Sequence, residues 1–179
     1  ALVAAEMVGF PVAMKIASHQ ISHKSDVGGV RLNIQSAQEV RTAYNHLVDA
    51  VQKKRPDAKI LGVTIEKMCK KPHGRELMIG VIRDPVFGPV VSFGAGGTAV
   101  EVMKDRSVAV PPLNKFIIKD IISQTKVAKL LGAFRNLPPV NMEEIEQVLL
   151  QVSAMTCELP EIQELDINPL IVDEEGAIA

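Results

Sequence analysis

The sequence predicts an α+β fold of two small subdomains, with mostly antiparallel strands and a cleft between two sheets. Two observations support this prediction. The chain has 179 residues, of which 47% are hydrophobic, enough for one domain or for two subdomains that share a cleft. Short apolar runs typical of strands recur along it, and a few longer stretches carry the apolar spacing of amphipathic helices.

The composition excludes several classes of function. The 20 Lys and Arg residues balance 21 Asp and Glu residues, and aromatic residues make up 3%, which argues against a nucleic-acid partner. The longest uncharged stretch, 85–100, is too short and too rich in Gly and Pro to span a bilayer. Cys69 and Cys157 are far apart in sequence and lack metal-ligand spacing, which fits a reducing compartment. We therefore predict a cytoplasmic protein without a membrane or nucleic-acid partner.

The first subdomain is expected to comprise residues 1–65. Its elements follow from apolar periodicity and from the turn and cap residues between them. In chain order they are a helix tail at 1–8 ended by Gly9, a buried strand at 10–17, a polar loop at 18–29, a strand at 30–34, a helix from the cap Ser36 to about Lys53, and a strand at 60–68 that runs past the boundary.

The second subdomain is expected to comprise residues 66–179. We expect the strands 60–68 and 76–83 to form a hairpin, because only a short loop separates them. The remaining elements are strands at 88–94 and 99–103, helices within 114–134 with a break near Gln124, a helix at 142–157 capped by Asn141, and a strand at 162–172 followed by the opening of another. Because the chain opens in a helix and stops inside a strand, we expect it to be truncated at both ends.

The stretch from residue 15 to residue 29 has the chemistry of a phosphate site. Lys15 stands on an apolar strand, where an ammonium is costly unless it reaches water or an anion. The loop that follows supplies an imidazole at His23, a cation at Lys24 and backbone N–H groups at Gly28 and Gly29. Alternatively, the Lys15 ammonium reaches solvent and the loop only reverses the chain. The stretch lacks the GxxxxGK[ST] pattern, so it is not a P-loop.

Two further patterns fit a nucleotide site. Glu66 and Glu76 stand near the ends of two consecutive strands, where carboxylates could accept from an adenine amino group or from ribose hydroxyls. They could equally be solvated edge charges. Gly94, Gly96 and Gly97 would let the backbone approach another group closely, although a structural bulge would need them too.

A strand near the end of the chain carries a possible metal site. Asp166 and Asn168 are two residues apart, so both side chains should face the same side of the strand. A carboxylate and an amide oxygen are ligands suited to Mg²⁺. The alternative is an ordinary Asp at a strand end followed by an Asn-Pro turn.

Four strings occur in order along the chain: FPVAMKI, ISHKSDVGGV, GRELMIGVIRDPVFGPVVSFGAGG and LPEIQELDINPLIV. Together they resemble the ATP-grasp domain of NDP-forming (ADP-forming) acyl-CoA synthetases, and ISHKSDVGGV and RDPVFGP are the most specific of them. The string VAVPPLN and the helix before LPEIQELDINP further resemble the bacterial branch that is fused to a GNAT protein lysine acetyltransferase.

The resemblance implies that ATP or ADP and Mg²⁺ bind between two α+β subdomains. Subdomain 1 (1–65) would hold the phosphate-binding loop 18–29, and subdomain 2 (66–179) the metal-binding strand near 164–170. The implied assignments are Lys15 and Lys24 to the phosphates, Glu66 and the backbone of Met68 to adenine, Glu76 to ribose, Gly96 and Gly97 to close approach of the nucleotide, and Asn168 with Asp166 to Mg²⁺. The family's second Mg²⁺ ligand would lie just past Ala179.

In the synthetases that this chain resembles, His23 matches a histidine that is transiently phosphorylated and relays a phosphoryl group to ADP. The implied reaction is acyl-CoA + ADP + phosphate ⇌ acid + CoA + ATP. The implied partners are CoA-binding and CoA-ligase domains of the same protein or complex, with a GNAT domain in the fused branch, and the fragment alone should not turn over. Alternatives are a non-catalytic regulatory or structural module of an acetyltransferase and another ATP-grasp ligase.

Overall fold

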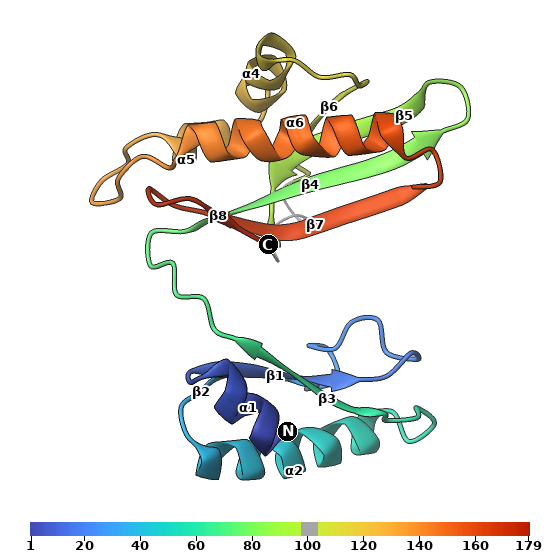
Figure 1. Ribbon diagram of the computed structural model, residues 1–179, viewed down its shortest axis with the longest axis vertical. Coiled ribbons are helices and arrows are strands. Elements are labelled where there is room, and N and C mark those ends of the chain that lie inside the picture. The colour runs from blue at the N-terminus through green and yellow to red at the C-terminus, as the bar shows by residue number, and fades with distance from the viewer. Residues whose placement is uncertain (98–103) are drawn as a thin grey trace. The chain divides into compact units, whose positions relative to one another are not determined.

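The computed structural model describes residues 1–97 and 104–179 and divides the chain into two compact units, Ala1–Lys70 (unit 1) and Lys71–Ala179 (unit 2) (Figure 1). Both units combine helices with an antiparallel sheet, so the α+β class is confirmed. The division falls five residues after the predicted boundary of 65, because the last strand of unit 1 runs to Lys67. Glu66 and Met68 therefore belong to unit 1.

Unit 1 is a three-stranded sheet in the order β2-β1-β3, with two helices packed on one face. Its elements are α1 (Leu2–Val8), β1 (Val12–Ala17), β2 (Val30–Ile34), α2 (Ala37–Lys54) and β3 (Gly62–Lys67). The central strand buries Val12, Met14 and Ile16 against the helices. The residues between them, including Lys15, consequently face the uncovered side of the sheet.

The start of α2 confirms the predicted cap. Ser36 Oγ accepts the N–H of Glu39 at 3.2 Å, and the Glu39 carboxylate accepts the N–H of Gln35 at 2.9 Å. This reciprocal pair satisfies two backbone donors at the exposed helix terminus. It fixes where the chain leaves β2 and enters the helix.

Unit 2 is a five-stranded sheet in the order β6-β5-β4-β7-β8, with α4 and α6 on one face. Its elements are β4 (Arg75–Asp84), β5 (Gly88–Ala95), β6 (Arg106–Ala109), α4 (Lys115–Ser123), α5 (Ala128–Leu131), α6 (Met142–Glu158), β7 (Glu164–Val172) and β8 (Ala177–Ile178). The predicted break near Gln124 is confirmed, since Gln124 follows the last residue of α4. The predicted strand at 99–103 lies outside the described residues.

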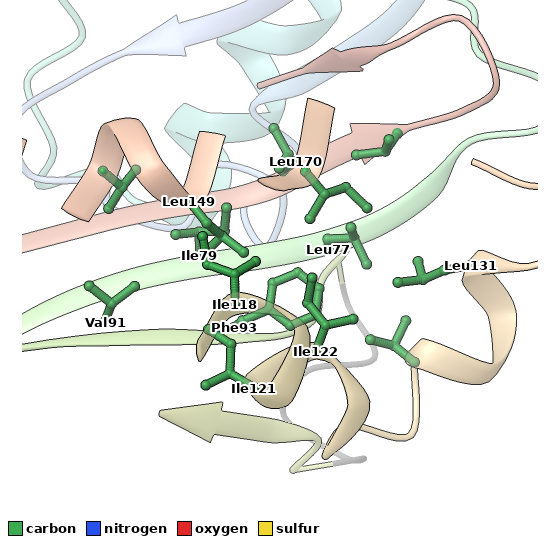
Figure 2. Close-up of a cluster of buried hydrophobic side chains, with 14 of the residues drawn as sticks. Leu77, Ile79, Val91, Phe93, Ile118, Ile121, Ile122, Leu131, Leu149 and Leu170 are labelled. Carbon is green, nitrogen blue, oxygen red and sulfur yellow. The ribbon is translucent and has the colours of Figure 1, made fainter. Parts of the chain in front are cut away.

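The core of unit 2 lies between the sheet and its helices. Leu77 and Ile79 of β4 and Phe93 of β5 are fully buried, and they pack with Ile118 of α4 and Leu149 of α6 (Figure 2). Each of these side chains gains roughly 1.5–3 kcal/mol from leaving water. Because strand side chains alternate, the residues between them are directed to the opposite face, which carries no helix.

The predicted hairpin between 60–68 and 76–83 is wrong. β3 pairs with β1 in unit 1, whereas β4 pairs with β5 and β7 in unit 2. Val63 and Ile65 pack in the core of unit 1, while Leu77 and Ile79 pack in the core of unit 2. Two strands whose apolar faces belong to different cores cannot be neighbours in one sheet, however short the loop between them.

In the described part of the chain, no helix has the length and apolar character needed to cross a membrane. The short connection between β7 and β8 in unit 2 is closed by Asp173. Its Oδ1 atom accepts the N–H groups of Glu175 (3.0 Å) and Gly176 (3.1 Å), and it pairs with Lys71 Nζ at 2.5 Å. These contacts, the Lys71 bond above all, hold the pKa of Asp173 below its ordinary value.

Asp173→Asn should lower the melting temperature at neutral pH. The melting temperature of this variant should also change less than that of the wild type as the pH falls into the acid range. The carboxyl is more acidic when folded, so its contribution is present above the unfolded pKa of about 3.9 and is lost as the pH falls through the lower folded pKa. Thermal denaturation between pH 7 and pH 2 measures this. Glu175→Gln, at an exposed position in the same turn, is the control, and equal acid profiles for the two variants would contradict the assignment.

Candidate functional site

The uncovered face of unit 1 brings Lys15 and Glu66 together. Lys15 on β1 is paired in register with Thr64 on β3, and Glu66 follows two residues later on the same face. The ammonium of Lys15 donates to Glu66 Oε2, and the two side chains stay 36% and 49% exposed. Exposed ion pairs are worth about 0–1 kcal/mol, so a polyanion could take the ammonium from the carboxylate at small cost.

The loop 18–29 leaves His23 exposed and Lys24 half-buried. The N–H of Gly29 donates to the carbonyl of Lys24 (2.8 Å), and the N–H of Gly28 donates to the carbonyl of Ser25 (3.0 Å). The expectation that these glycine N–H groups hold phosphates is therefore wrong: they close the loop on itself. The imidazole of His23 is accessible to solvent, as a side chain that accepts and passes on a phosphoryl group would have to be.

The backbone of Met68 is less free than the sequence implied. Its N–H donates to the carbonyl of Pro11 at 3.0 Å, which ties the end of β3 to the start of β1. That donor is not available to a base, so any backbone contact from Met68 would have to use its carbonyl oxygen.

The uncovered face of unit 2 carries the predicted metal ligands. Along β7 the residues alternate in exposure, and Glu164, Asp166 and Asn168 are the exposed ones. The prediction that Asp166 and Asn168 share a face is confirmed. They border a groove of about 260 Å³ over the sheet. Its polar lining side chains are Ser92, Arg106, Glu164, Asp166 and Asn168.

Gly96 and Gly97 follow β5 and bond to residues of β4 and β7. Gly96 N–H donates to the carbonyl of Glu76 (2.8 Å), and Gly97 N–H donates to Asn168 Oδ1 (2.8 Å). A Cβ atom on Gly97 would overlap the Glu76 carboxylate, and one on Gly96 would overlap the backbone of Leu77. Within the protein, the groups that these glycines approach closely are Glu76, Leu77 and Asn168, and their approach to a nucleotide stays a prediction.

The donor set fits a magnesium ion that arrives with phosphates. Within the described residues no three His, Cys, Asp or Glu side chains gather as a metal cluster. Mg²⁺ commonly uses one or two protein oxygens, with phosphate oxygens and water completing its shell. Asn168 Oδ1 accepts one hydrogen bond and keeps a second lone pair, and the neighbouring Asp166 carboxylate is exposed.

Sequence reasoning missed three of the polar side chains that line the groove: Ser92, Arg106 and Glu164. Glu164 could have been found, because it continues the alternation that joins Asp166 to Asn168. Ser92 and Arg106 lie on β5 and β6, whose pairing brings them to this face. No local motif marks either residue.

A family model described as an ATP-grasp domain matches residues 1–179. The chain is 44% identical over 172 residues to the beta subunit of acetate–CoA ligase (ADP-forming) I of Pyrococcus furiosus, which covers 96% of this chain and 73% of that subunit. It is 40% identical over 176 residues to 4-hydroxybutyrate–CoA ligase (ADP-forming) of Nitrosopumilus maritimus. That match covers 98% of this chain but 25% of the relative.

Among solved structures, the chain superposes on the dinucleotide forming acetyl-coenzyme A synthetase 1 of Ca. Korarchaeum cryptofilum. In its complex with coenzyme A, Ca-AMPCP and HgCl⁺ the TM-score is 0.91 at 41% identity, over 99% of this chain and 76% of that one. Its complex with coenzyme A and Mg-AMPPCP gives 0.84 at 38% identity, over 99% and 76%. In the latter a phosphohistidine segment points towards the nucleotide binding site.

Gly97→Ala should destabilise unit 2 and disturb the site. Gly97 has φ +68°, a left-handed conformation that costs other residues about 1–2 kcal/mol, and the added methyl would displace Glu76. Urea denaturation measures the loss. Gly132→Ala is the matched control, because Gly132 has φ −74° and open space around it. Equal stabilities of the two variants would refute the packing argument.

Proposed function

Since the chain belongs to the ATP-grasp domains of the ADP-forming acetate–CoA ligase family and has their α+β fold, we propose that it binds ATP or ADP with Mg²⁺. The observation that carries the proposal is a group of side chains on the uncovered face of unit 2: Asn168, which accepts from the N–H of Gly97, Glu76, which lies against Gly97, and Asp166 beside them. The matched structures of the Ca. Korarchaeum cryptofilum enzyme contain Mg-AMPPCP or Ca-AMPCP.

We assign the proposed roles to the residues of each unit in turn. Asn168 and Asp166 would hold Mg²⁺, which lowers the charge repulsion between phosphates, and Glu76 would accept from the ribose hydroxyls. Lys15 and Lys24 would offset phosphate charge, and Glu66 with the Met68 carbonyl would face the base. The division into subdomain 1 with loop 18–29 and subdomain 2 with the strand near 164–170 is part of this proposal.

The proposed chemistry is phosphoryl transfer through His23. A neutral imidazole nitrogen of His23 attacks the phosphorus of a phosphohistidine on the CoA-ligase domain, and the P–N bond of that donor breaks as its imidazole leaves. The terminal oxygen of ADP then attacks the phosphorus, and the bond to His23 breaks to give ATP. Lys15 and Lys24 stabilise the charge that spreads over the transferring oxygens. The exposed position of His23 supports this role, as does the phosphohistidine segment of the Ca. Korarchaeum cryptofilum enzyme.

The complete reaction would require further domains. We propose that the chain works with CoA-binding and CoA-ligase parts, as one polypeptide or as a subunit, and catalyses acyl-CoA + ADP + phosphate ⇌ acid + CoA + ATP only with them. The match to one quarter of a longer CoA ligase and to a beta subunit supports both arrangements. A cytoplasmic location is consistent with the free, exposed Cys69 and Cys157.

The finer assignment, to the branch fused to a GNAT protein lysine acetyltransferase, stays a prediction from VAVPPLN and the helix before LPEIQELDINP. The relatives described above are CoA ligases, and none of the contacts in either unit favours a regulatory module. Sequencing the open reading frame on both sides of this chain decides the matter: a GNAT domain would support the branch, and its absence would exclude it.

Calorimetric titration of ATP and ADP, with and without Mg²⁺, tests nucleotide binding. We expect saturable binding that Mg²⁺ tightens, and Lys15→Ala should weaken ATP binding by at least about 1.5 kcal/mol through loss of a charge-assisted hydrogen bond. Lys53→Ala, on the exposed surface of α2, is the control. Unchanged affinity in Lys15→Ala would remove Lys15 from the phosphate site, and no binding to the wild type would contradict the proposed function.

In the complete ligase, His23→Ala should abolish an acid-labile phosphoryl label on this domain and leave nucleotide binding intact. The reason is that the variant keeps the nucleotide-binding groups and lacks the nucleophile. Radiolabelling with phosphate-labelled ATP, followed by acid treatment, measures it. His19→Ala, an exposed histidine of the same loop, should keep the label. A label that persists in His23→Ala would place the phosphoryl acceptor elsewhere.

A further inference from the structure

The strand register of unit 2 lines up residues across the uncovered face in rows. Arg106 on β6 is paired with Gly94 on β5, and Gly94 is paired with Met78 on β4. On β7, Asn168 lies between the partners of Leu77 and Ile79, so it continues the same row. Arg106 and the metal-ligand candidate Asn168 therefore stand at opposite ends of one row, roughly 14 Å apart across three strand spacings.

The neighbouring row also crosses the four strands from β6 to β7. Val108 on β6 is paired with Ser92, Ser92 with Gly80, and Gly80 with Asp166. Gly80 and Ser92 are small and lie in the middle, and a Cβ atom on Gly80 would come within 2.8 Å of Ser92 Oγ. The small residues Gly80, Ser92 and Gly94 leave room for the groove of about 260 Å³, and Met78 is a large side chain that lines its middle.

The two walls of the groove differ in charge. β7 contributes the carboxylates of Glu164 and Asp166, together with the amide of Asn168, whereas β6 contributes the guanidinium of Arg106. Arg106 is exposed, and its guanidinium has no hydrogen bond or ion pair with any residue that the structure describes. A groove with oxygen ligands on one wall and a free guanidinium on the other fits an anion that carries a divalent cation.

The position of Arg106 is fixed by its neighbours in sequence. The buried Asp105 carboxylate accepts the N–H groups of Lys126 (2.6 Å) and Val127 (2.7 Å). Ser107, on the helix-covered face, donates to Gln124 Oε1 at 2.9 Å. These contacts fix the backbone of β6 on both sides of Arg106, and strand alternation then directs the Arg106 side chain to the groove, which it lines.

We propose that Arg106 is a phosphate-binding residue of this site and forms the wall opposite the Asp166–Asn168 metal ligands. The proposal rests on the proposed nucleotide function and extends it. A guanidinium donates two parallel hydrogen bonds to phosphate oxygens, and its long side chain reaches over Gly94 towards the middle of the groove. The phosphates then lie between the metal on β7 and the guanidinium on β6.

Calorimetric titration of Mg-ATP into the wild type, Arg106→Ala, Arg106→Lys and the control Lys119→Ala tests the proposal. Lys119 is exposed on α4, which covers the other face of the sheet. We expect Arg106→Ala to raise the Kd about tenfold or more, since a charge-assisted contact is lost. Arg106→Lys should restore part of the affinity, because an ammonium keeps the charge without the paired geometry. Lys119→Ala should bind as the wild type does.

The outcomes separate the two proposals. If the wild type binds and Arg106→Ala binds as tightly as Lys119→Ala, the role of Arg106 is refuted and the nucleotide function stands. If the wild type does not bind, the nucleotide function itself fails. Melting temperatures without nucleotide identify a folding defect: a weakened Arg106→Ala variant that melts normally and is partly rescued by Lys supports direct contact. If Arg106→Lys restores no affinity and Arg106→Ala melts at a lower temperature than the wild type, direct contact is contradicted.

Discussion

The alternation of side chains along each strand is the constraint on which the rest of the structure depends. In both units helices cover one face of the sheet, so every second residue of a strand is committed to a core. The residues between them have no such role and are free to be polar. Lys15 lies between the buried residues Met14 and Ile16 on β1, and Asn168 is an exposed residue in the alternating pattern of β7. The two-residue alternation of the strands thus decides both which side chains form the cores and which are available for the candidate site.

A second element of the design is the main chain, which holds the candidate side chains in place. Asn168 accepts from the N–H of Gly97, and the glycine turn in turn lies against Glu76. These contacts cross from β5 to β4 and β7, so three strands must be in register before the group exists. The side chains that could meet a nucleotide and a cation are therefore positioned by pairing between strands distant in sequence.

Much of this could be predicted from the sequence, and the failures have a common cause. Periodicity and caps located α2 and α6, and spacing placed Asp166 and Asn168 on one face. The hairpin between β3 and β4 failed because a short loop does not say which core each strand joins.

The N–H groups of Gly96, Gly97 and Met68 are already bonded within the protein, which a sequence does not show. Arg106 was missed because only the pairing of β6 with β5 brings it to the groove. Local pattern predicts elements and faces, whereas contacts between distant strands decide which groups are free.

The ion pair between Lys15 and Glu66 has a consequence for selectivity. While Glu66 holds the ammonium, this part of the surface is close to neutral, and an incoming anion must outcompete a carboxylate that is already in contact. A singly charged anion such as acetate offers the lysine little more than Glu66 already does. A polyphosphate with several negative charges offers more, particularly where further cations are near. Because an exposed pair of this kind is worth only about 0–1 kcal/mol, the carboxylate would tilt the preference of the lysine towards polyanions by a small amount.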